Sequence, residues 1–270
     1  MDQSRQQRRR HDRQRKRLHR KLYQEGLYPS AGEAPQSVVV LVHHLIEILK
    51  RRTDSRRASR AAAAVHKVFD ASLEHHRSLP PLDCKLGCAH CCSLFVSAAI
   101  PEVLLLAGTI RRGAEDEAER LKAQIILSRR AADQLTIGDT VRKPVPCGLL
   151  RDNLCTQYAV RPLGCRGHVS QSVDACLANA GDPSVMIPGS KPHGEAARDS
   201  KLALFAALKA MGLPHRSYEL NAALERALES DDAERRWLEG EDLFQGLPVD
   251  PTRTPAVEDI LDQLILDAAT

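Results

Sequence analysis

The sequence is poor in aromatic residues and in long apolar runs. Phe, Trp and Tyr together make up 3% of the 270 residues, so Leu, Ala, Val and Ile must build the core. The most apolar run, residues 38–49, is interrupted by His43, His44 and Glu47, which makes it too short and too polar to span a bilayer. No apolar segment follows the basic start closely enough to form a secretory signal. We therefore expect a cytoplasmic protein that does not use a membrane.

Cysteine is lacking over most of the chain and concentrated in one part of it. All eight cysteines lie between residues 84 and 176. In a reducing compartment, disulfides are disfavoured and clustered cysteines more often bind a metal or carry out redox chemistry. A buried, inert thiol explains one or two of them, since free cysteine packs like a small apolar residue. It does not explain their clustering. The candidate metal ligands are Cys84, Cys88, Cys91, Cys92, Cys147, Cys155, Cys165 and Cys176.

The formal net charge of +4 hides an uneven distribution. Residues 1–22 hold ten Arg and Lys residues against Asp2 and Asp12, so the remainder of the chain is net acidic. We interpret residues 1–30 as a basic, largely disordered arm that aids solubility. Binding of nucleic acid by this arm is the less favoured interpretation, because the arm offers few aromatic residues for base stacking and no known binding motif surrounds it.

Helical spacing of apolar residues dominates both sides of the cysteines. The predicted fold is mainly α, with a small, irregular, β-hairpin-containing core that is rich in cysteine and binds metal, and with helices flanking it on both sides. Beyond the arm we expect a helical region at 31–80, the cysteine-cluster domain at 81–180 and a second helical region at 181–270. The expected helices cover residues 36–52, 55–76, 101–112, 114–135, 196–211, 217–229, 232–238 and 255–268.

Turn residues punctuate the cysteine-rich part. The stretch 93–97 is short and suits an extended segment, and residues 181–194 are rich in Gly and Pro and suit a connector. Residues 147–158 contain the corner Arg151-Asp152-Asn153 and predict a hairpin that places Cys147 and Cys155 on neighbouring strands. The alternating strand–helix units of a nucleotide-binding sheet are missing.

The spacing CKLGCAHCC at 84–92 allows sulfur atoms to converge. Gly87 is free to adopt positive φ, so Cys84, Cys88 and Cys91 can be supplied by one turn. Adjacent residues such as Cys91 and Cys92 project in different directions, so one can serve a first centre while the other faces a second centre or the core. Zinc and iron–sulfur centres each take about four sulfur ligands, so eight cysteines are enough for two. The metal, and whether there are one or two centres, stay open.

The downstream part, CGLLRDNLCTQYAVRPLGCRGH followed by Cys176, completes a joint pattern with CKLGCAHCC. This pattern resembles the YkgJ-like cysteine-cluster family, described as a zinc- or iron-chelating domain, over about residues 80–180. Gln157 and Gly167-His168 depart from the family's usual residues. The matching positions are the eight cysteines together with Leu149, Leu150, Tyr158, Arg161, Pro162 and Arg166.

What the resemblance implies is a metal-binding protein whose reaction is unassigned. One branch of the family includes the flagellin lysine N-methylase, so the alternative is an iron–sulfur-dependent enzyme of protein lysine methyl transfer or redox chemistry. A second alternative is a nucleic-acid-associated module with a purely structural metal.

Arg161 and Arg166 flank Cys165 and are candidate cofactor-binding residues. A guanidinium beside thiolates offsets their negative charge or holds an anionic substrate. The competing interpretation is an ion pair or packing that fixes the turn at Pro162. His90 and His168 lie within the pattern, but with eight sulfurs available neither is needed as a ligand.

Overall fold

A computed structural model describes residues 36–74, 76, 78–133, 145–182, 184–248 and 255–269. The basic arm expected at 1–30, and with it the alternative of nucleic-acid binding through that arm, lies outside the described residues. The described chain is mainly helical and has two small antiparallel sheets of two strands each, which confirms the predicted fold class. No helix within the described ranges is long and apolar enough to cross a lipid bilayer.

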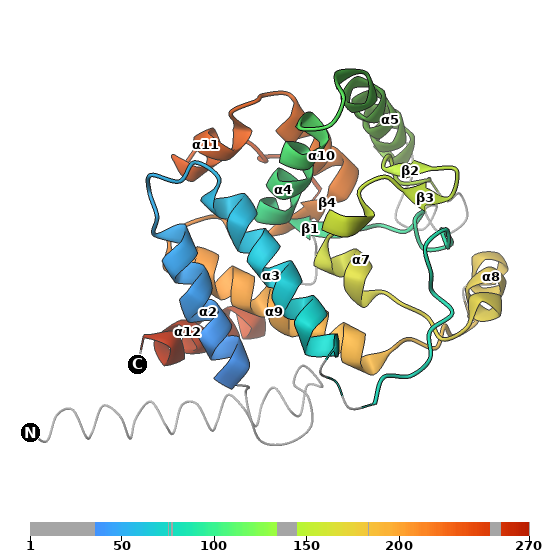
Figure 1. Ribbon diagram of the computed structural model, residues 1–270, viewed down its shortest axis with the longest axis horizontal. Helices are drawn as coiled ribbons and strands as arrows, with labels where there is room; N and C mark the ends of the chain where they lie inside the picture. Colours follow the sequence, from blue (N-terminus) through green and yellow to red (C-terminus); the bar gives the residue numbers. More distant parts are fainter. Residues whose placement is uncertain are drawn as a thin grey trace, which may run out of the picture.

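Helix α9 (Lys191–Ala210) is the centre of the helical packing. It packs against α2 (Gln36–Leu49), α3 (Arg57–Glu74) and α12 (Pro255–Ala268), which Figure 1 shows gathered on one side of the molecule. Small side chains on the buried faces allow close approach of the helix backbones, which compensates for the scarcity of aromatic residues. The buried alanines of α3 and α9 that allow this approach are Ala58, Ala61, Ala62, Ala203, Ala206 and Ala207.

Three further helix–helix contacts extend this core. Helix α4 (Ile100–Arg111) packs against α3, and α10 (Leu220–Leu228) packs against both α4 and α5 (Glu115–Asp133). The short α11 (Ala233–Leu238) contributes the fully buried Trp237. One hydrophobic cluster therefore joins the helices from α2 to α12, but it takes none of the described residues of 74–95 or of 164–195.

Strands β1 (Ser97–Ala99) and β4 (Ser217–Glu219) pair antiparallel, with Ala98 opposite Tyr218. Each strand runs directly into a helix, α4 after β1 and α10 after β4. The expected helix at 217–229 therefore begins three residues late, because its first three residues pair with β1 instead. The extended segment expected at 93–97 reaches regular strand pairing only at Ser97.

The cysteine-bearing elements lie on the opposite side of the molecule from α2 and α12 (Figure 1). They are the hairpin of β2 (Leu150–Arg151) and β3 (Leu154–Cys155) and the short helices α7 (Leu163–Gly167) and α8 (Val173–Gly181). The 3-10 turn η1 (Tyr158–Val160), which holds no cysteine, lies between the hairpin and α7. This region is short of regular structure, as predicted, and it is joined to the common core by few buried side chains. Two of these are Leu149 and Leu163, which are 2% and 1% exposed.

Helix α9 begins at Lys191, whereas the sequence predicted a connector as far as residue 194. Pro192 lies in the first turn of the helix, where a missing N–H costs nothing. Gly194 follows within the helix, because tertiary packing outweighs its low helix propensity. The expectation of a connector was therefore wrong for the last four residues, 191–194.

Candidate metal centre

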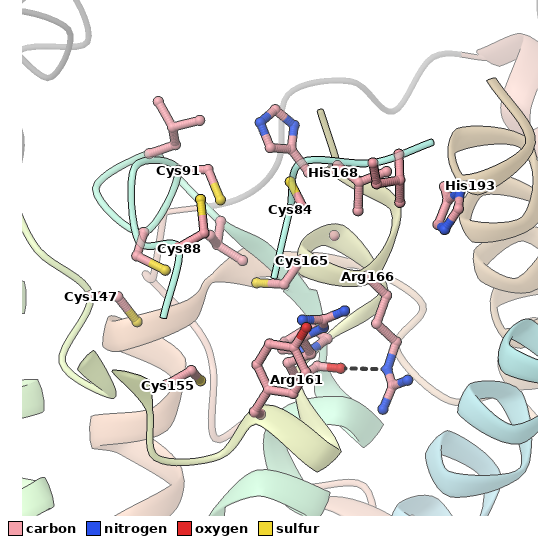
Figure 2. A pocket seen from close by; sticks show the side chains of 18 of the residues that line it. Cys84, Cys88, Cys91, Cys147, Cys155, Arg161, Cys165, Arg166, His168 and His193 are labelled. Atoms are coloured by element: carbon pink, nitrogen blue, oxygen red, sulfur yellow. Dashed lines mark hydrogen bonds between the residues drawn. The ribbon is translucent and has the colours of Figure 1, made fainter. Parts of the chain in front are cut away.

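Seven of the eight cysteines line one pocket of about 730 Å³. The pocket lies between the C-terminal half of α3, the segment that follows it, the hairpin and α7. Cys176 is the exception, because it sits on α8 outside the lining. Figure 2 shows the sulfur atoms toward one end and His193 at the other, with Arg161 between them. The cysteines of the lining are Cys84, Cys88, Cys91, Cys92, Cys147, Cys155 and Cys165.

The first cysteine segment folds as consecutive turns. The N–H of Cys88 donates to the carbonyl of Lys85 at 3.0 Å, and the N–H of Cys92 donates to the carbonyl of Ala89 at 2.9 Å. Gly87 has φ +90°, a conformation that L side chains rarely adopt, so the expectation of a positive φ there is confirmed. These turns place four cysteines on a short stretch without any regular element.

The second segment is a tight hairpin. Asp152 and Asn153 have φ of 49° and 62°, as a two-residue turn of type I′ requires. Cys155 lies in β3, but Cys147 precedes β2, so the two are not on neighbouring strands as the sequence analysis expected. The correction follows from strand length: the ladder holds only two residues on each side, and Leu150 is the residue that pairs with Cys155.

A backbone hydrogen bond joins these two segments directly. The N–H of Cys147 donates to the carbonyl of Cys92 at 2.7 Å. The next residue, Gly148, is bound to α10, because its N–H donates to Oδ1 of Asn221 at 2.9 Å. A Cβ on Gly148 would lie 2.5 Å from Cα of Ile125, so only glycine fits there. The doubled cysteine is thereby fixed against the start of the hairpin.

The buried side chain of Glu102 binds the first residue of α7. Its Oε1 accepts from the N–H of Leu163 at 2.7 Å, and its Oε2 accepts from the N–H of Ala99 at 2.9 Å. Nε2 of His66 lies 3.1 Å from the same Oε1. Burial opposes ionisation of the carboxyl, but His66 and the two N–H groups outweigh it and lower the pKa of Glu102. Sequence reasoning missed this role, although an acidic residue in the first turn of an expected helix was a signal for a cap.

Arg166 is a structural residue of the same loop. Its Nη1 donates to Oδ1 of Asp70 at 2.7 Å and its Nε to the carbonyl of Arg161 at 2.9 Å, the bond drawn in Figure 2. The remaining Nη2 donates to the carbonyl of Ala159. Of the two interpretations, fixation of the turn is the one these contacts support, because each of the three guanidinium nitrogens of Arg166 already has a partner within the fold.

Arg161 faces the thiols. Its guanidinium carbon lies 3.9 Å from the centre of the Tyr158 ring, a cation–π contact. Its positive charge favours ionisation of the thiols of Cys155 and Cys165. Within the described residues its Nε is buried and has no hydrogen-bond partner. A buried donor beside several sulfur atoms is suited to donate to a thiolate or to another anion.

Burial favours the neutral form of four of the thiols. Burial raises the pKa of Cys147 to about 11 and also raises the pKa values of Cys84, Cys155 and Cys165. A side-chain hydrogen bond between the vicinal cysteines raises the pKa of Cys91 and lowers that of Cys92. A thiol that coordinates a cation is deprotonated outright, so a bound metal ion would reverse this state.

Backbone N–H groups already point at several sulfurs. The N–H of Ser170 donates to Sγ of Cys84 at 3.1 Å. The N–H groups of Leu149 and Gln157 favour ionisation of the cysteines two residues before them, Cys147 and Cys155. Hydrogen bonds to sulfur tune metal–thiolate centres. All eight cysteines, which lie within the described ranges, are free of disulfides. The donor set therefore fits a thiolate-bound metal or cluster.

Histidine is placed differently from the cysteines. His90 is exposed and is not part of the pocket lining, whereas His168 is part of it. The sequence analysis did not single out His193, which also lines the pocket. Its Nδ1 lies 2.7 Å from the hydroxyl of Ser190, and burial, Arg161 and His76 lower its pKa. No local signal marked His193, because it lies in the stretch expected to be a connector.

As they stand, the side chains do not converge on a point. Among the described residues, no three His, Cys, Asp or Glu side chains are arranged to hold one metal ion. Comparison with known proteins adds nothing to this geometry: no family model, curated protein or solved structure matches the chain.

Proposed function

We propose that the chain is a metal-binding protein that holds zinc or an iron–sulfur cluster through its cysteines. The observation that carries the proposal is the gathering of seven free cysteines in one pocket, from segments up to 81 positions apart in the sequence. Inert thiols would not need one shared pocket, and disulfides have not formed among them. Membership of the YkgJ-like family, which the cysteine pattern resembles, is part of the same proposal.

The ligands would be cysteine thiolates, and the supporting residues would be those that contact or orient them. Arg161 would offset the negative charge of the sulfurs, and the N–H of Ser170 would stabilise the thiolate of Cys84. Glu102 and Arg166 would keep α7, and therefore Cys165, in position. Zinc would supply a closed structural site, whereas an iron–sulfur cluster would add electron transfer.

The direct test is metal analysis of the full chain after anaerobic purification. We expect zinc, or iron with sulfide, at one or more equivalents per chain. Broad absorption near about 400 nm would select iron over zinc, because sulfur-ligated iron absorbs there. A chain that contains neither metal and in which all eight thiols titrate freely would contradict the proposal.

A second candidate is an enzyme that uses the centre. The pocket of about 730 Å³ has room for more than a metal, and ligand pockets generally fall between roughly 300 and 1,000 Å³. Apolar side chains extend the wall beyond the sulfurs, among them Leu73, Leu79 and Phe95. If the centre is iron–sulfur, a change in its spectrum on addition of S-adenosylmethionine would support methyl transfer. Irons that are all closed by cysteine, together with an unchanged spectrum, would contradict it.

A further inference from the structure

The pocket that the cysteines line has a second end, away from most of the sulfur atoms. His193 of α9 marks this end in Figure 2. The rings of His193 and Phe69 lie edge to face, with their centroids 6.4 Å apart. Leu73 follows Phe69 by one turn of α3, so the two side chains share a helix face, and both line the pocket. We call the part formed by Phe69, Leu73 and His193 the α3–α9 end.

Large apolar side chains of the lining are left partly uncovered. Leu79, which follows α3, is 39% exposed, and Phe95 is 51% exposed. Exposed apolar side chains are ordinary where they are scattered singly, but these two share one concave lining with Leu73. The apolar body of a ligand would cover them, and removal of both surfaces from water would favour binding.

Arg161 lies between the two ends of the pocket (Figure 2). Its guanidinium stacks on the ring of Tyr158, a contact that positions the charge without using an N–H donor. No carboxylate among the described residues pairs with this guanidinium, and its buried Nε has no hydrogen-bond partner there. Arg166, by contrast, is paired with Asp70. Within the described chain, the pocket therefore holds a positioned positive charge that no acidic side chain neutralises.

The charges of the lining favour one kind of anion. Arginine carries five N–H donors, so a bond from Arg161 to a thiolate of the metal centre leaves other donors for a second anion. The planar fork of these donors matches a carboxylate through two parallel bonds. The acidic Asp70 and Glu74 also line the pocket, and the remaining cation of the lining, Lys85, is exposed. Two nearby negative charges disfavour a doubly charged phosphate more than a singly charged carboxylate.

We propose that the pocket binds a small monocarboxylic acid with an apolar body. Its carboxylate binds Arg161, and its body packs against Leu79 and the α3–α9 end. This inference goes beyond the proposed metal binding and assigns a second ligand to residues that are not metal ligands. The pocket of about 730 Å³ is large enough for such a molecule beside a metal ion. The acid would lie next to the centre, where an enzyme that uses the centre would need its substrate.

Calorimetric titration of the full chain, purified anaerobically with whatever metal it holds, tests the carboxylate. The probes are phenylacetate and hydrocinnamate, the neutral amides of both acids, and acetate, which has the charge without the body. We expect at least one of the two aromatic acids to bind roughly tenfold or more tightly than its amide, since a hydrogen bond to a charged group is lost in the amide. Acetate should bind more weakly than that acid. Acids that bind no better than their amides, or fail to bind, would overturn the proposal.

Leu79→Gln tests the position of the apolar body. We expect unchanged metal content and circular dichroism, because the side chain is partly exposed and is not a metal ligand. The affinity for the aromatic acid should fall by about threefold or more, as expected when at least one methylene group is no longer buried. Leu127→Gln on α5 is the matched control, since Leu127 is 66% exposed and does not line the pocket. Equal affinities for these two variants would overturn the assigned position.

Arg161→Gln tests the charge. The affinity for the aromatic acid should fall by roughly tenfold or more, whereas the affinity for its amide should stay the same. Acid and amide are compared on one sample, so a loss of metal from this variant affects both measurements alike. A preference for the acid that survives in Arg161→Gln would overturn the assigned role of the guanidinium. A chain that holds metal but does not prefer the acids would contradict this inference alone, and a chain without any metal would contradict the proposed function.

Discussion

The backbone N–H of Ser170 donates to Sγ of Cys84 at 3.1 Å, although the two residues are 86 positions apart. This bond reaches from the segment after α7 back to the first cysteine of the cluster. It shows that the downstream residues do more than supply sulfur, because their backbone also contacts the upstream sulfur. The geometry around the cysteines is therefore set by the fold as a whole, and substitutions away from the sulfurs should affect it.

Arg161→Gln should weaken metal binding by roughly tenfold, the smaller end of the effect seen when a group outside the ligands is lost. The substitution removes the positive charge that favours ionisation of Cys155 and Cys165. Arg161→Lys should recover part of the affinity because it keeps the charge. Competition with a chelator measures the affinity, and substitution of the exposed Arg120 on α5, Arg120→Gln, is the control. Equal affinity for Arg161→Gln and the control would show that the charge is irrelevant.

Arg166→Ala should destabilise the protein by about 2–3 kcal/mol, because Asp70 and two partly buried carbonyl groups lose their buried donor together. Asp70→Asn should cost less, about 1 kcal/mol or below, since its side chain is 52% exposed. Urea unfolding of the two variants provides the comparison. A larger loss for Asp70→Asn than for Arg166→Ala would contradict the structural role assigned to the guanidinium.

Glu102→Gln should destabilise the protein at neutral pH by about 1–3 kcal/mol, because an amide cannot accept all the bonds that the carboxylate accepts. The pKa of Glu102 is lowered in the folded state, so its contribution is present above the unfolded pKa, near 4.3. This contribution is lost as the pH falls through the lower, folded pKa. The stability difference between the unmodified chain and Glu102→Gln should therefore shrink in acid. A difference that does not depend on pH would exclude the ionised carboxylate as its source.

Gly167→Ala should be strongly destabilising, by about 2 kcal/mol or more, because the new Cβ would lie 2.4 Å from Cβ of Ala197 on α9. Gly194→Ala, which adds a methyl group on α9 itself, is the matched control. Nothing lies within 4 Å of a Cβ at that position, so the added methyl should stabilise the protein by up to about 1 kcal/mol. Thermal unfolding measures both variants. Similar melting temperatures for the two would contradict the close approach of α7 to α9.

The helices could be predicted from sequence because apolar spacing and terminal residues are local signals. The helix predicted at 36–52 is an example: it is observed at Gln36–Leu49, and its apolar residues recur at helical spacing from Val38 onward. The start of α9 could not be predicted in this way, because packing overrides the glycine at 194. Likewise, the first residues of α10 were lost to a strand pairing with β1, which is a contact between residues about 120 positions apart.

The cysteines of the pocket could be predicted from the sequence, but the residues that support them could not. Cysteine is recognisable in any sequence. Of the eight cysteines that the clustering singled out, seven line the pocket and Cys176 does not. His66 and Glu102 act through a buried contact between two helices, and His193 reaches the pocket from the start of α9. Such roles depend on the three-dimensional packing of residues that are ordinary in sequence. The different roles of Arg161 and Arg166 likewise became visible only from their contacts.

The hydrogen bond between the N–H of Cys147 and the carbonyl of Cys92 also bears on how the chain reaches its folded state. It closes a loop of 55 residues, and closing such a loop costs conformational entropy that one hydrogen bond does not repay. A metal held by sulfurs on both sides of this loop would act as a covalent crosslink does, restricting the unfolded ensemble by about 4 kcal/mol on the entropy model used for disulfides. Metal supply would then determine how much of the newly made chain persists in the folded form.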